Sequence, residues 1–219
     1  MLRLSLAVIL IFAGWLPIGA AQAGEEFIQP YFGGVTDKWR AVQSRMRADS
    51  ERLARCRADA EACSLAEKRL EAIVDAARVR DGRARIGEIN RAVNLAIRPM
   101  SDMRRFGMLD LWTAPLDTMS AGAGDCEDYA ILKFLALREA GIPIDDLRLV
   151  IVHDAMMRSD HAVVAARLAQ RWVVLDNRGF ALIDLARTRY RTIVSLALDG
   201  DRLAPRYADA IPSDRSLAL

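Results

Sequence analysis

The stretch Gly122-Ala123-Gly124-Asp125-Cys126-Glu127-Asp128-Tyr129-Ala130 decides how the rest of the chain is organised. Its two glycines allow a tight turn, and the apolar periodicity of residues 128–139 predicts an amphipathic helix directly after it. Asp125 stands where an N-cap is expected, and Asp128 follows at about the spacing of a capping box. Cys126 is therefore predicted in the first helical turn, where free N–H groups and the helix dipole favour a thiolate. This pattern predicts a nucleophilic cysteine.

The alternative for Cys126 is a packing role, because free cysteine is among the residues most often found in protein cores. Packing does not account for the three carboxylates of Asp125, Glu127 and Asp128 around it. Carboxylates close together are costly unless they cap a helix, bind a cation or face water. We therefore prefer the nucleophile interpretation.

The composition predicts a globular protein with one core, since 53% of the 219 residues are hydrophobic and 27% are charged. A net charge of +2 gives no indication of a nucleic-acid partner. Arg3, the apolar run of residues 4–16 and Ala21-Gln22-Ala23 form the pattern of a signal peptide with its cleavage site. We expect residues 1–23 to be removed and residues 24–219 to form a single exported domain. An uncleaved membrane anchor is the alternative.

Export affects the three cysteines, because oxidising compartments favour disulfides. Cys56 and Cys63 are close in sequence, which leaves Cys126 as the odd thiol. Seven residues of unbroken helix rise by about 10 Å, more than a disulfide spans. A bridge between Cys56 and Cys63 therefore requires a break around residues 59–62, and two unpaired core cysteines are the alternative.

The order of elements predicts an α+β fold, in which N-terminal helices and the cysteine helix pack on an antiparallel sheet. A lead-in segment is expected over residues 26–34 and an ordered loop over 98–123. Trp112, within that loop, either covers the core edge or forms one wall of a substrate cleft. The other expected helices begin after Thr36-Asp37 and span 65–80 and 85–97, and the strands span 147–152, 161–167, 171–176 and 190–198.

A cysteine nucleophile needs a base, and the base needs an orienting group. His161 begins the second expected strand and Asp176 ends the third, so a hairpin makes them neighbours at one end of the sheet. His153, at the end of the first strand, is the other candidate base. A structural histidine bonded to a loop carbonyl and a turn-forming aspartate are the alternative roles of His161 and Asp176.

Five segments together resemble the bacterial transglutaminase-like cysteine peptidases, a family that includes LapG-type periplasmic proteases that release adhesins. These segments are Val93-Asn94, Asp110-x-Trp112-x-x-Pro115, Gly124 to Ala130, His161-Ala162-Val163 and Leu175-Asp176-Asn177. The resemblance implies a papain/transglutaminase-like fold with Cys126, His161 and Asp176 as the catalytic triad.

The same resemblance implies calcium bound by Asp125, Glu127 and Asp128, and no organic cofactor. Clustered carboxylates suit calcium, which takes six to eight oxygen ligands, although N-capping and exposure also explain such acids. It further implies a surface adhesin as substrate and an inner-membrane cyclic di-GMP receptor that sequesters the protease.

Two other functions fit the same residues. A transglutaminase or a peptidoglycan amidase also uses a Cys-His pair on this framework, so the fold alone does not distinguish them. A non-catalytic periplasmic binding protein that keeps the fold is the second alternative, and its cysteine would be unreactive.

Overall fold

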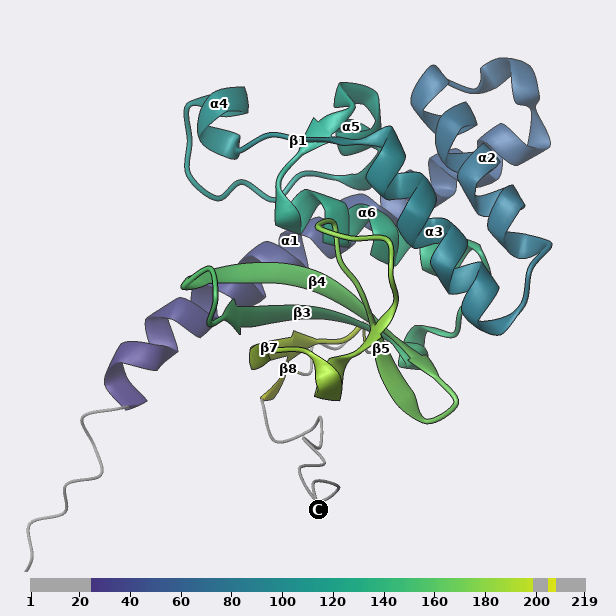
Figure 1. The fold of residues 1–219 in the computed structure, drawn as a ribbon. Coiled ribbons are helices and arrows are strands. Elements are labelled where there is room, and N and C mark those ends of the chain that lie inside the picture. The colour runs from purple at the N-terminus through teal and green to yellow at the C-terminus, as the bar shows by residue number, and fades with distance from the viewer. Residues whose placement is uncertain (1–24, 199–204, 208–219) are drawn as a thin grey trace, which may run out of the picture.

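A computed structural model describes residues 25–198 and 205–207, and the segment 1–23 expected as a signal peptide lies outside them. A layer of helices packs on one face of an antiparallel sheet (Figure 1). Within the described residues, no helix combines the length and apolar character needed to cross a membrane. The fold class is α+β, as predicted.

Six α-helices are described, and the longest is also the first. Their bounds are α1 Glu25–Ala58, α2 Leu65–Arg78, α3 Gly82–Ala96, α4 Asp102–Phe106, α5 Pro115–Ala121 and α6 Cys126–Glu139. Three 3₁₀ turns connect elements at η1 Ala60–Ala62, η2 Ile144–Asp146 and η3 Leu185–Arg187.

Two expectations about these helices are wrong. The segment 26–34 is part of α1 rather than a lead-in, because extending an existing helix adds one hydrogen bond per residue and offsets the low propensity of glycine. The expected loop 98–123 contains α4, α5 and a parallel pair of short strands, β1 Arg98–Pro99 and β2 Ala123–Gly124. These elements are too short for apolar periodicity to reveal them.

The described six-stranded sheet has the order β6-β5-β4-β3-β7-β8 and is antiparallel throughout. Its strands are β3 Leu147–Asp154, β4 Ser159–Leu168, β5 Arg171–Leu175, β6 Ile183–Asp184, β7 Tyr190–Leu196 and β8 Pro205–Tyr207. A tight turn joins β4 to β5, in which Ala169 and Gln170 have φ values of 47° and 67°. Positive φ at both positions matches the right-handed twist of a two-residue hairpin. This hairpin fixes the relative position of His161 and Asp176.

Helix α6 occupies the centre of the molecule, between β3 and β4 on one side and α2, α3 and α5 on the other (Figure 1). Its side chains are buried on nearly every face, so it lacks the polar stripe of a surface helix. Trp39 of α1 packs edge-on against Phe134 at 5.3 Å between ring centroids. The opposite face of the sheet carries a second apolar cluster built on Val150, Val163 and Val174.

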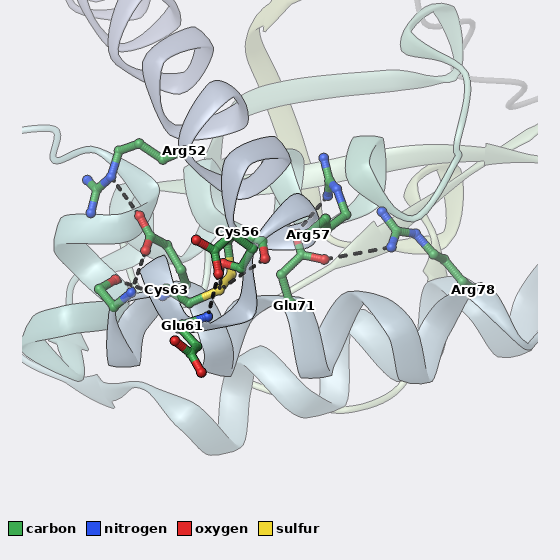
Figure 2. The surroundings of a disulfide bond; sticks show 10 residues. Arg52, Cys56, Arg57, Glu61, Cys63, Glu71 and Arg78 are labelled. Carbon is green, nitrogen blue, oxygen red and sulfur yellow. Dashed lines mark hydrogen bonds and ion pairs between the residues drawn. A yellow bond between two sulfur atoms is a disulfide. The ribbon is translucent and has the colours of Figure 1, made fainter.

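A disulfide joins Cys56 to Cys63, with 4.8 Å between their Cα atoms. The end of α1 at Ala58 and the turn η1 supply the helix break that this bridge requires. Figure 2 shows the bridge among ion pairs that tie α1 to α2, including Arg52–Glu67 at 2.8 Å and Arg57–Glu71 at 2.7 Å. The bridge therefore closes one corner of the helical layer.

Replacing both bridge cysteines with alanine is expected to lower the free energy of unfolding by about 2.5 kcal/mol, the chain-entropy value for so short a loop. Urea denaturation of the double variant and the wild type measures the difference. Because the bridge lies in the helical layer, away from Cys126, peptidase activity of the folded variant should match the wild type. Equal unfolding free energies would show that the α1–α2 ion pairs alone hold this corner.

Candidate active site

The approach to Cys126 is fixed by the pairing of β1 with β2. The N–H groups of Arg98 and Met100 donate to the carbonyls of Gly122 and Gly124, each at 2.9 Å. A side chain at Gly124 would place its Cβ only 2.6 Å from the Cβ of Asp128. Glycine is therefore required at position 124, and the chain enters α6 directly with Cys126 as the first helical residue.

His161 and Asp176 meet at the open end of the β4–β5 hairpin, just beyond the last strand pair, Val164–Leu175. The Nε2 atom of His161 lies 2.9 Å from Oδ1 of Asp176, and only 2% of the histidine is exposed. Burial alone would raise the pKa of Asp176, but hydrogen bonds from His161, Tyr190 and the Arg178 N–H hold that pKa well below its usual range. Asp176 is therefore an anion that orients the imidazole.

The Cys126 sulfur lies against the backbone next to His161, where the Ala162 N–H donates to it. The Nδ1 atom of His161 is buried and has no hydrogen-bond partner among the described residues. Since Nε2 is taken by Asp176, Nδ1 is the ring nitrogen left to accept a proton. Strand β4 thus carries the free ring nitrogen at residue 161 and the backbone donor to the thiol at residue 162.

The thiol proton is directed elsewhere in this structure, because Sγ of Cys126 donates to Oε2 of Glu127 at 2.9 Å. Burial raises the pKa of the Cys126 thiol, and the Glu127 carboxylate raises it further. The expectation that the helix start lowers this pKa is therefore wrong, since burial and a neighbouring anion outweigh the helix dipole. Transfer of the proton to His161 requires the thiol to turn away from Glu127.

Three aspartates form an acidic cluster beside the thiol. Oxygen atoms of Asp102, Asp125 and Asp128 lie within 4.8 Å of one another. Oδ1 of Asp102 and Oδ1 of Asp125 are buried without a hydrogen-bond partner in the described part of the chain. Burial, followed by the charges of Glu127 and Asp128, raises the pKa of Asp125 to about 8. Unpaired buried oxygens around shared negative charge fit a cation site.

The cluster differs from the set expected from sequence, because Asp102 takes the place of Glu127. Residues three apart on a helix share a face, so Asp125 and Asp128 converge, whereas Glu127 points to the cysteine. Asp102 begins α4, far upstream in sequence, and no spacing signal identifies it. Asp125 is at the N-cap position of α6 but forms no side-chain cap bond.

Asp128 also holds the surrounding loops together. Its Oδ2 pairs with the Arg105 guanidinium at 2.5 Å, and its Oδ1 accepts from the N–H and hydroxyl of Thr113 at 3.0 and 2.6 Å. The carboxylate therefore links α6 to α4 and to the segment that precedes α5.

The structure gives two other predicted residues different roles. Trp112 is only 4% exposed and belongs to the core, with its indole N–H donated to Asp110 at 2.9 Å, which fits the core-edge role. His153 pairs with Asp160 at 3.0 Å on the exposed end of β3 and β4. It forms no described contact with Cys126.

Three residues to which the sequence assigned no role lie around Asp176. The amide of Asn94 on α3 donates to the carbonyls of Asp176 and Gly179, at 2.8 and 2.9 Å, and so anchors the loop after β5. The Tyr190 hydroxyl donates a hydrogen bond to Asp176. Burial lowers the pKa of Lys133 on α6, and the negative charge of the same carboxylate raises it by a smaller amount. Asn94 is part of the Val93-Asn94 motif, whereas the other two carry no sequence signal.

Comparison with known proteins adds to this geometry. The sequence profile of the bacterial transglutaminase-like cysteine proteinases matches residues 47–199. Calcium-bound Legionella pneumophila LapG has a TM-score of 0.60 at 21% identity, over 76% of this chain and 93% of that one. EGTA-treated LapG from the same organism has a TM-score of 0.57 at 19% identity, over 77% of this chain and 91% of that one. A search of curated proteins finds no match.

The solved structures share the fold of this chain, and the family match indicates the class of reaction, peptide hydrolysis by a cysteine. The matched region includes Cys126, His161 and Asp176 together with the helix and hairpin that carry them. It also extends over most of the chain, so it is not a likeness of one motif. The chain therefore belongs to the bacterial transglutaminase-like cysteine proteinases and is a cysteine peptidase.

Proposed function

We propose that this protein is an endopeptidase with Cys126 as nucleophile, His161 as general base and Asp176 as the orienting carboxylate. The observation that carries the proposal is the state of His161: its Nε2 is bound to Asp176, its buried Nδ1 has no described partner, and the next residue, Ala162, donates its N–H to the Cys126 thiol. An imidazole held in this way has one tautomer, with the proton on Nε2 and the lone pair on Nδ1.

The chemistry follows from that tautomer. Nδ1 of His161 takes the thiol proton, and the thiolate attacks the carbonyl carbon of the peptide bond. The oxyanion accepts a hydrogen bond from the Cys126 backbone N–H, which has no partner within the helix because it is in the first turn. The imidazolium then gives its proton to the leaving amine. Water, deprotonated at the same nitrogen, hydrolyses the thioester and releases the acid product.

Proteome-wide cleavage tests this proposal. Envelope and surface proteins of the source cells are incubated with wild type or with Cys126→Ala, and newly formed N-termini are identified by mass spectrometry. We expect discrete new N-termini with the wild type alone. The same N-termini with Cys126→Ala would exclude Cys126 as the nucleophile, and their absence with both proteins would exclude peptidase activity on these substrates.

We propose that the acidic cluster of Asp102, Asp125 and Asp128 binds calcium. The two unpaired buried oxygens support this, because calcium takes six to eight oxygen ligands and favours carboxylates. The calcium-bound form of LapG adds support, although it describes that protein alone. Bound calcium would neutralise charge between α4 and the start of α6, and these three residues would hold it.

Calcium is expected to raise the thermal midpoint of unfolding, since a ligand present at 100 times its Kd stabilises the folded state by about 2.7 kcal/mol. Scanning calorimetry with added calcium or EGTA measures the shift. The double variant Asp102→Asn with Asp125→Asn should lose the calcium response, whereas Asp117→Asn, an exposed acid on α5, should keep it. A wild type whose midpoint is the same in calcium and EGTA has no calcium site.

We also propose a cellular location and a substrate for this enzyme. The signal-peptide pattern of residues 1–23 supports export to the periplasm, and the family resemblance supports a surface adhesin as the protein that is cleaved. The same resemblance supports control by an inner-membrane cyclic di-GMP receptor that sequesters the enzyme. The N-terminal sequence of the protein recovered from cells tests the export step, with a start near Gly24 expected.

A further inference from the structure

Tyr190 lies outside the triad but contacts two of its members. It begins β7 and pairs with Asp154 of β3, which brings its side chain to the end of the sheet that carries His161. Its hydroxyl donates to Oδ2 of Asp176 at 2.5 Å. Its ring meets the imidazole edge-on, with 5.9 Å between centroids and 61° between planes. One side chain therefore restrains both the acid and the base.

The two oxygens of Asp176 have different partners. Oδ1 accepts from Nε2 of His161 at 2.9 Å and from the Arg178 N–H at 3.0 Å. Oδ2 accepts from Tyr190 alone among the described hydrogen bonds. The tyrosine hydroxyl thus fixes the rotation of the carboxylate, and that rotation decides whether Oδ1 is aligned with the imidazole.

Tyr190 and Asp176 also face an open cavity of about 290 Å³, which Met156, Val174 and Arg187 line as well. A cavity of this size admits water, and the Tyr190 hydroxyl occupies Oδ2 of Asp176 at its wall. Without the hydroxyl, water would compete for Oδ2 and loosen the carboxylate. Oδ2 of Asp176 therefore needs a fixed hydrogen-bond donor from the protein, which the Tyr190 hydroxyl supplies.

The phenol is suited to remain a donor. Burial, followed by the hydrogen bond to Asp176, raises the pKa of Tyr190 above its usual value, so the hydroxyl is protonated at neutral pH. A donor that stays protonated at neutral pH keeps its hydrogen bond to the carboxylate.

We propose that Tyr190 is a positioning residue of this peptidase, which holds Asp176 and, through it, the imidazole of His161 in the orientation that proton transfer requires. This inference rests on the proposed roles of Cys126, His161 and Asp176. It predicts that loss of one oxygen atom, without any change in ring packing, weakens the reaction and not substrate binding.

The test compares Tyr190→Phe with Thr192→Val, which removes a hydroxyl from the same strand with no described bond to the triad. The Nε2–H of His161 should give a downfield proton NMR signal, and its assignment is simple because the chain has 2 histidines. We expect Tyr190→Phe to shift this signal, to lower kcat about tenfold, as for a lost hydrogen bond to a charged group, and to leave KM unchanged. Thr192→Val should match wild type in all three.

Tyrosine at position 190 replaced by 3,5-difluorotyrosine covers the case in which the phenylalanine variant does not fold. This residue keeps the shape of the side chain and changes the strength of its donor, so the imidazole signal should move without loss of structure. An unchanged imidazole signal and unchanged kcat in a folded variant overturn the inference. The NMR signal is read without substrate, so a failure of the peptidase proposal would be seen separately, as wild type that cleaves nothing.

Discussion

Asp176→Asn is expected to reduce kcat by about 10⁴-fold while KM stays close to the wild-type value, the effect known for asparagine at the carboxylate of such a triad. Asp176 accepts the Nε2 proton of His161 and so leaves the lone pair on Nδ1 for the thiol. An amide that presents its NH₂ group to Nε2 favours the opposite tautomer, in which Nδ1 carries the proton and cannot act as a base. It also removes the charge that stabilises the imidazolium.

Steady-state kinetics on a peptide that spans a mapped cleavage site measures this loss. Asp160→Asn is the matched control, because Asp160 forms the only other described Asp–His pair, with the half-buried His153. If kcat of Asp176→Asn falls as little as kcat of Asp160→Asn, Asp176 has no role in the mechanism.

The same variant has a pH signature in stability. The pKa of Asp176 is lowered in the fold, so its contribution is fully present above the unfolded pKa of about 3.9 and is lost as pH falls through the folded value. Asp176→Asn should therefore be less stable than wild type at pH 7, with a smaller difference at acid pH.

Lys133→Met is expected to stabilise the protein at pH 6 by on the order of 4 kcal/mol. Lys133 is fully buried in α6, and its ammonium has no hydrogen-bond acceptor in the described part of the chain. Its Nζ lies 5.7 Å from the centroid of the Tyr129 ring. Burial lowers its pKa to about 7, and the charge of Asp176 opposes this only in part.

The pH dependence of that gain follows from the direction of the shift. Between pH 7 and pH 10 the unfolded chain holds a proton on Lys133 that the folded chain lacks, so wild-type stability rises with pH in this range. Methionine has no proton to lose and fills nearly the same volume. The gain should therefore be largest at or below pH 6 and small near pH 10.

Urea denaturation at pH 6 and pH 9 measures this dependence, with Lys68→Met, an exposed residue of α2, as control. A Lys133→Met protein that gains equally at both pH values would show that the lysine is not desolvated. In that case the folded wild type at pH 6 would have to supply a hydrogen-bond acceptor for the Lys133 ammonium.

Local patterns were enough to predict the elements that carry the chemistry. The glycines, the acids and the apolar periodicity around Cys126 predicted α6, and alternation with a short turn predicted the hairpin of His161 and Asp176. Both signals depend on residues close together in sequence, where periodicity and turn chemistry apply.

Contacts between distant segments could not be predicted in this way. Asp102 joins the acidic cluster because β1 pairs with β2, and Tyr190 reaches Asp176 because β7 pairs with β3 across the sheet. The thiol pKa was also mispredicted, because the helix dipole is a local property whereas burial depends on the whole fold. Local sequence patterns thus predicted the elements that carry Cys126, His161 and Asp176, and the fold added the contacts that Asp102 and Tyr190 make.

The central claim is that a peptide is attached to Cys126 during cleavage, and trapping that thioester tests it most directly. The enzyme is mixed with a substrate peptide, quenched in acid within one turnover and digested, and the adduct is located by mass spectrometry. We expect the mass of the N-terminal product, less one water, on the fragment that contains Cys126, released by hydroxylamine and missing from Cys126→Ala. Cleavage without any adduct on that fragment, or an adduct on another residue, would contradict the account.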